Sequence, residues 1–275
     1  MRGLASSAAV VLLALFAAAC TTTSTETRTP AGASSAPPPP PRERAANEET
    51  DNARRARTRL ELAAAYFSRG QYDVAGDEVK RALAADPVNA DAYNLRGLIQ
   101  AAQGDDAAAE DSFRRSIQLD ARGGEAISNY GWFLCQRKRY PEAHAQFDAA
   151  LAIPTYRDQT RTLFAKGVCQ AFEKNYAAAE GTLTRALRFE PNNPAIATNL
   201  AEELYRLGQY PRARDTIRRV NAMAGVANAQ TLWLAARIER RLGNNGAVAE
   251  LGQRLGSEFT DSPEADAFAK GRWSE

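Results

Sequence analysis

Residues 56–87, ARTRLELAAAYFSRGQYDVAGDEVKRALAADP, carry the pattern that decides the fold. Apolar and small residues return every three to four positions, which is the spacing of one face of an α-helix. Gly70 interrupts this pattern and Pro87 ends it. Glycine permits a tight reversal of the chain, and proline stops a helix. The stretch therefore predicts two helices joined by a turn, with Tyr66 packing from the first helix and Ala75 from the second.

The same pattern returns along the chain with a period of 34 residues. Copies start near residues 56, 90, 124, 160, 194 and 228, and only the step from 124 to 160 is longer, at 36 residues. This period and pattern resemble the tetratricopeptide repeat. One such repeat cannot bury its own apolar face, so neighbouring repeats must stack to form the core. We expect an all-α fold, a right-handed superhelix of about six helix-turn-helix repeats.

Small residues recur at the eighth and twentieth positions of the repeats, where they are expected to let the two helices cross closely. These repeat-packing residues are Gly97, Gly131 and Gly167 in the first helices and Ala75, Ala109, Ala143, Ala179 and Ala213 in the second helices. The two extra residues of the long step fall near Pro154, which should end a helix early and lengthen the loop. The sixth copy is weaker, and Ser262 with Pro263 predicts one more short helix behind it.

The N-terminal segment has the features of a bacterial lipoprotein signal peptide. Arg2 supplies a positive charge, residues 10–16 form an apolar core too short to span a bilayer, and small residues precede Cys20. The order resembles a lipobox, whose cysteine is lipidated after cleavage; the alternative is a soluble secreted protein in which Cys20 has no special role. We expect a signal peptide at 1–19, a lipidated, Thr/Ser/Pro-rich disordered tether at 20–52, the repeat domain at 53–260 and a C-terminal cap or tail at 261–275.

Composition and charge argue against several classes of function. The net charge is +2 over 275 residues, with both signs interleaved. A nucleic-acid-binding surface would need a clustered basic excess. The single histidine, His144, is not part of a sequence pattern for a catalytic triad, a phosphate loop or a zinc site. We expect a protein that is not an enzyme and that uses no cofactor, metal, nucleic acid or small-molecule substrate.

The first helix of each repeat is expected to line the concave face of the superhelix, and its inward positions are unusually apolar in the first four repeats. The predicted partner-binding residues are Leu60, Ala64, Phe67, Asn94, Leu98, Trp132, Phe164 and Val168. Such a groove suits an amphipathic helix or an extended peptide, unless curvature or the C-terminal cap already covers it. We expect docking on the first repeat, because no earlier repeat covers its outer face.

Cys135 and Cys169 stand at positions 12 and 10 of two consecutive first helices. Adjacent first helices pack side by side in this architecture, and an offset of two residues is only about 3 Å along the axis. In an oxidising periplasm these two thiols remain once Cys20 is lipidated. The spacing favours a disulfide between them, and the alternative is two free buried cysteines.

A more specific resemblance lies in three segments: residues 129–151, NYGWFLCQRKRYPEAHAQFDAAL; the loop with Pro154; and GVCQAF around Cys169. They resemble the type IV pilus biogenesis lipoproteins of the PilF/PilW family. The resemblance implies a lipid-anchored pilotin at the periplasmic face of a Gram-negative outer membrane. Its partner would be the pilus secretin subunit (PilQ-type), whose outer-membrane localisation and multimer assembly it would promote by protein–protein binding. The alternative is a periplasmic scaffold of another envelope complex, for cell-wall synthesis or outer-membrane protein assembly.

Overall fold

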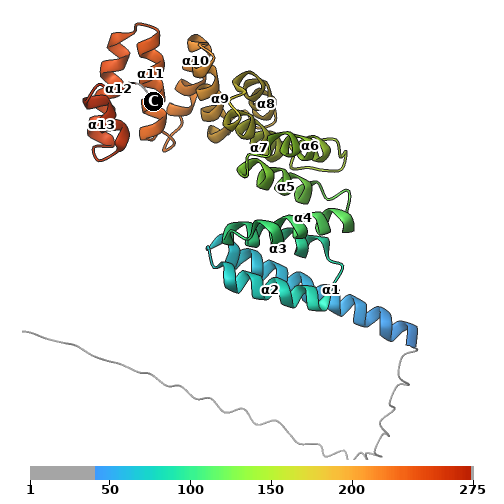
Figure 1. Cartoon of the computed structure of the whole chain (residues 1–275). Helices are drawn as coiled ribbons and strands as arrows, with labels where there is room; N and C mark the ends of the chain where they lie inside the picture. The colour runs from blue at the N-terminus through green and yellow to red at the C-terminus, as the bar shows by residue number, and fades with distance from the viewer. Residues whose placement is uncertain (1–40, 274–275) are drawn as a thin grey trace, which may run out of the picture. The chain divides into compact units, whose positions relative to one another are not determined.

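The computed structural model describes residues 41–273, which form thirteen α-helices and no strand (Figure 1). The helices are α1 (Pro41–Ser68), α2 (Tyr72–Ala85), α3 (Ala90–Gln103), α4 (Asp106–Leu119), α5 (Gly124–Gln136), α6 (Tyr140–Leu151), α7 (Gln159–Phe172), α8 (Tyr176–Phe189), α9 (Pro194–Arg206), α10 (Tyr210–Asn221), α11 (Ala229–Arg241), α12 (Asn245–Glu258) and α13 (Pro263–Ala269). The predicted signal peptide, Cys20 and residues 20–40 of the predicted tether lie outside the described residues. The chain divides into two units, Met1–Arg44 and Ala45–Glu275, and the repeats belong to the second.

The helices from α1 to α12 follow one another as pairs, one pair for each predicted repeat. The first helices from the second repeat onward start within one residue of the predicted positions: α3 at Ala90, α5 at Gly124, α7 at Gln159, α9 at Pro194 and α11 at Ala229. First helices of neighbouring repeats also contact one another, α3 with α5, α5 with α7, α7 with α9 and α9 with α11. The predicted all-α stack of helix-turn-helix repeats is confirmed. Along residues 41–273, none of the helices combines the length and the apolar run that a membrane crossing needs.

Helix α1 begins earlier than the sequence pattern predicts. The predicted tether reaches residue 52, whereas the helix starts at Pro41. The segment between them, RERAANEETDN, is rich in alanine, glutamate and arginine, which favour a helix, and contains no glycine or proline. Proline suits a first helical position because its fixed φ fits the helix and the N–H it lacks would have no partner there. Residues 41–52, the last part of the predicted tether, are therefore helical.

Within a repeat the two helices cross at small residues. A Cβ added at Gly97 would lie 2.9 Å from the Phe113 ring, and one at Gly167 would lie 2.7 Å from Leu183. At Gly131 a ring of the second helix would lie 3.0 Å from the added atom. Such distances leave no room for a side chain in a close-packed interior. The five alanines expected to pack from the second helices are all 0% exposed: Ala75, Ala109, Ala143, Ala179 and Ala213.

The long step between the third and fourth repeats is a packed loop. Helix α6 ends at Leu151, before Pro154, as the sequence predicts. Tyr156 from this loop lies so close to Gly124 that an added Cβ would be 2.5 Å from its ring. The Tyr156 hydroxyl is also hydrogen-bonded to the Thr162 hydroxyl at 2.9 Å. The two extra residues therefore fill space between the repeats.

The predicted short C-terminal helix forms as α13. The Ser262 hydroxyl caps it by accepting a hydrogen bond from the Ala265 N–H at 3.1 Å. The Trp273 ring stacks on Trp233 of α11 at 4.8 Å and meets Phe268 of α13 edge-on at 5.3 Å. This aromatic cluster holds the residues after α13 against the last repeat.

Candidate functional site

Two adjoining clefts open on the first helices of the second, third and fourth repeats. Their volumes are about 740 Å³ and 480 Å³. Leu98, Asn129 and Trp132 line both clefts, which together we call the Trp132 groove. The larger cleft is also lined by Phe67, Ala101, Ala102, Phe113, Phe133, Cys135, Gln136, Arg137, Lys138, Tyr140 and Phe172, and the smaller by Ser128, Arg161, Phe164, Ala165, Val168 and Asn199.

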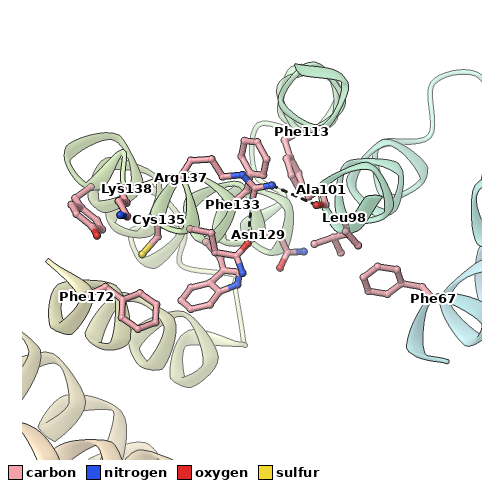
Figure 2. Close-up of a pocket in the computed structure, with 14 residues that line it drawn as sticks. Phe67, Leu98, Ala101, Phe113, Asn129, Phe133, Cys135, Arg137, Lys138 and Phe172 are labelled. Carbon is pink, nitrogen blue, oxygen red and sulfur yellow. Dashed lines mark hydrogen bonds between the residues drawn. The ribbon is translucent and has the colours of Figure 1, made fainter. Parts of the chain in front are cut away.

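Aromatic side chains dominate the larger cleft. Figure 2 shows Phe67 and Phe172 on opposite sides of it, with Leu98 and Cys135 between them. Phe172 is 56% exposed, and its ring lies 6.2 Å from that of Trp132. Leaving a side chain of this size in water forgoes about 1.5–3 kcal/mol relative to burial. An exposed aromatic side chain in a concave site is typical of surfaces that bind a partner.

Polar side chains in the groove and beneath it link each first helix to the next. Asn129 Nδ2 on α5 donates to Asn94 Oδ1 on α3 at 3.1 Å, and Arg161 Nη2 on α7 donates to Asn129 Oδ1 at 2.9 Å. The Thr162 hydroxyl on α7 donates to the Ser128 hydroxyl on α5 at 2.9 Å. Asn94, Ser128, Asn129 and Thr162 are buried, and a buried polar group without a partner is costly. These bonds therefore favour one register between neighbouring repeats.

Cys135 and Cys169 are joined by a disulfide between α5 and α7. Their Cα atoms lie 5.9 Å apart, and both side chains are buried. Cys135 lines the larger cleft, and Phe172 follows Cys169 at the end of α7. The disulfide therefore links the two helices that carry the contact between Trp132 and Phe172.

The turn after α5 forms the polar end of the larger cleft. The Arg137 guanidinium lies over the Phe133 ring at 4.5 Å and donates a hydrogen bond to the Asp106 carboxylate. That hydrogen bond lowers the pKa of Asp106. Lys138 follows with a φ of 59°, a left-handed backbone conformation that helps to end the helix. Arg137 is thus held by a ring and a carboxylate, which keeps the turn in place beside the groove.

The predicted partner-binding residues separate into two groups. The structure gathers Phe67, Leu98, Trp132, Phe164 and Val168 in the Trp132 groove. Leu60 is half-buried and lines a separate cleft of about 390 Å³ with Arg54, Arg57 and Asp91. Ala64 is exposed and lines neither cleft of the groove, and Asn94 is buried beneath its bond to Asn129. The larger apolar surface lies mainly on the second to fourth repeats, and Phe67 is the residue that the first repeat contributes to it.

Sequence reasoning missed the polar residues of the groove. Asn129 and Asn199 each occupy the sixth position of their repeat, and Arg161 occupies the second position of the fourth repeat. An amide at the same place in two repeats, beside the inward apolar positions, is a signal that could have indicated them. Amide side chains can both donate to and accept from a peptide backbone. The groove therefore combines apolar walls with groups that suit a polypeptide ligand.

His144 lies outside the groove. Its Nε2 atom is 2.9 Å from Glu173 Oε2, between α6 and the turn that follows α7. Within residues 51–273, no group of three or more His, Cys, Asp and Glu side chains is placed to hold a metal ion. The apolar and polar side chains that converge in the Trp132 groove are those of a binding surface.

Comparison with known proteins agrees with this architecture. Two family models, both described as tetratricopeptide repeat, match residues 46–126 and 173–238. The type IV pilus assembly protein PilF of Pseudomonas aeruginosa is 28% identical over 218 residues, which cover 79% of this chain and 85% of that protein.

Two solved structures share the fold over nearly their whole length. PilW, described as a widely conserved type IV pilus biogenesis factor, is 31% identical with a TM-score of 0.71, over 78% of this chain and 98% of PilW. The structure of Pseudomonas aeruginosa PilF is 26% identical with a TM-score of 0.70, over 80% of this chain and 99% of PilF. The predicted resemblance to the PilF/PilW family is thereby confirmed. The chain belongs to the PilF/PilW family of tetratricopeptide-repeat proteins, whose named members are type IV pilus assembly and biogenesis proteins.

Proposed function

We propose that this protein is a pilotin, an outer-membrane lipoprotein that promotes the localisation and multimer assembly of the pilus secretin. The Trp132 groove is the observation that carries the proposal, because it offers a partner an apolar surface on a register-locked stack of helices. The relationship to PilF and PilW directs the proposal to type IV pilus assembly.

In this proposal a segment of the secretin subunit lies along the groove as an amphipathic helix or an extended strand. Its apolar side chains bury the rings of Trp132 and Phe172, and its polar groups bond to Asn129 and Asn199. Binding energy in such interfaces is concentrated in a few buried aromatic residues. We therefore expect Trp132 and Phe172 to carry most of the affinity.

Anchoring is the second part of the proposal. Lipidation of Cys20 would hold the repeats at the periplasmic face of the outer membrane, since two or more acyl chains give durable attachment. Residues 21–40 would serve as the tether. Cys20→Ser is expected to release the protein into the soluble periplasm or leave it uncleaved in the inner membrane, as membrane fractionation would show. Wild-type fractionation of this variant with outer membranes would contradict the anchor.

Two exposed phenylalanines provide a matched test of the groove. Phe172 is 56% exposed inside it, whereas Phe189, at the end of α8, is 59% exposed and lines neither cleft. Phe172→Ser is expected to reduce the secretin multimers that survive on unheated gels, and Trp132→Ala should do the same. Phe189→Ser should leave the multimers at the wild-type level, and circular dichroism should show all three variants folded.

Two outcomes would contradict the proposal at different levels. Equal multimer levels with Phe172→Ser and Phe189→Ser would show that the groove is not the docking surface. Normal multimers and intact twitching in a strain that lacks the gene would exclude the pilotin role and favour a scaffold of another envelope complex.

A further inference from the structure

A different cleft lies near the C-terminal end of the stack, between α9, α11 and the residues after α13. Its volume is about 400 Å³, and it is lined by Tyr205, Arg237, Arg240, Arg241 and Trp273, which we call the arginine cleft. Within the described part of the chain, no acidic side chain lines it. Three guanidinium groups thus share a concave site with two aromatic rings.

The aromatic rings hold the guanidinium groups in place. Arg240 lies over the Trp273 ring at 4.4 Å, and Arg237 lies over the Tyr205 ring at 4.8 Å. Arg241 Nε donates to the Tyr205 hydroxyl at 3.5 Å. Stacking uses the flat face of a guanidinium and leaves the N–H groups at its edge able to donate. Trp273 itself stacks on Trp233 of α11, so this wall of the cleft is packed against the last repeat.

A carboxylate beside the cleft already forms ion pairs with arginine side chains. Arg237 is paired with Glu202 at 2.8 Å, and Arg206 is paired with the same carboxylate at 3.1 Å. Among residues 51–273, no carboxylate lies within ion-pair distance of Arg240 or Arg241. These two arginines stand in the last turn of α11, where the helix dipole favours a cation. The helix dipole explains why cations stand in the last turn of α11, but it does not explain the aromatic rings that pack against them.

We propose that the arginine cleft binds carboxylate side chains from an acidic segment of a partner protein. A planar guanidinium fork matches a carboxylate with two parallel hydrogen bonds. The pairing of Arg237 with Glu202 shows that this environment accepts that ligand chemistry. A concave site of about 400 Å³ walled by two rings also fits a side chain better than it fits a flat lipid surface. The site is separate from the Trp132 groove and does not depend on the secretin as partner.

The test is a titration of the purified full-length protein with a fluorescein-labelled peptide of six glutamates, followed by fluorescence anisotropy. The same peptide with six glutamines should bind far more weakly. Arg240→Gln and Arg241→Gln should each raise the Kd by about tenfold or more, because a hydrogen bond to a charged group is lost. Arg240→Lys should also weaken binding, since lysine keeps the charge but lacks the planar fork.

Arg219→Gln is the matched control, because it removes the same charge from an exposed position in the last turn of α10. It should leave the Kd within about twofold of wild type, while circular dichroism confirms that all variants fold. An equal loss with Arg219→Gln would overturn the proposal in favour of general charge attraction. Binding to vesicles of equal parts phosphatidylglycerol and phosphatidylcholine, without binding of the peptide, would overturn it in favour of a lipid surface. Peptide binding seen only with Glu275→Gln would instead assign the cleft to the chain's own C-terminal residues.

Discussion

Removing the disulfide should weaken the middle of the stack more than any single contact there. Cys135 and Cys169 are separated by 34 residues, and cross-linking a loop of that length lowers the chain entropy of the unfolded state. The chain-entropy relation gives about 4 kcal/mol at 25 °C for this loop. The disulfide joins the third and fourth repeats, and stability in a repeat stack depends on contacts between neighbours. The loss should therefore concentrate in the interface between α5 and α7.

Denaturant unfolding followed by circular dichroism would measure this effect on three samples: the oxidised protein, the same protein in dithiothreitol, and the variant with both Cys135→Ala and Cys169→Ala. The reduced protein and the double variant should unfold at similar, lower denaturant concentrations, and dithiothreitol should not change the double variant. Hydrogen exchange should speed up first in α5 and α7. A reduced wild-type protein that unfolds at the same concentration as the oxidised one would refute the entropic argument. A loss confined to the alanine variant would point to packing instead.

Three other expectations concern stability. Burial raises the pKa of Glu203 to about 7. The cost of burying its charge is therefore small below pH 4.5, grows as the pH rises from 4.5 to 7, and is complete above that. Glu203→Gln should raise the free energy of unfolding at pH 8 by up to about 3 kcal/mol, and an equal gain at pH 5 would contradict this. Gly97→Ala should lower the free energy of unfolding by about 1–3 kcal/mol, because the added Cβ would lie 2.9 Å from the buried Phe113 ring. Gly181 has open space around it, so Gly181→Ala should be neutral or stabilising in the same unfolding assay. Gly252→Ala should displace the Phe268 ring of α13, which packs on Gly252, and should lower the melting temperature. Unchanged tryptophan fluorescence in that variant would argue against a packed cap.

The repeat architecture could be predicted from the sequence because its contacts recur at one short distance along the chain. Each repeat touches its neighbours, so the same residue types return every 34 residues or so, and the period marks where each first helix starts. The small residues at the helix crossings follow from the same logic, as the lack of space beside Gly97 and Gly167 shows. The pairing of Cys135 with Cys169 likewise follows from their nearly equal positions in adjacent helices.

The location of the open surface depended on the tertiary structure. Leu60 and Trp132 both stand at inward positions of first helices, yet Leu60 lines a smaller cleft beside charged side chains, and Trp132 lines two large ones. An inward position shows only which way a side chain points. Whether it remains open depends on the side chains that neighbouring repeats place around it, and on the register that Asn129 and its bonds favour between those repeats.

The arginine cleft shows the same dependence over a longer distance. Arg240 is an exposed cation in the last turn of α11, and its guanidinium stacks on the ring of Trp273, which lies 33 residues later in the chain. Helical periodicity does not predict this contact, because the contact follows from the aromatic packing of α13 and the residues after it. The sequence by itself therefore determined the repeats and their internal packing, whereas the sites between repeats were decided by how the folded stack and its C-terminal cap bring distant side chains together.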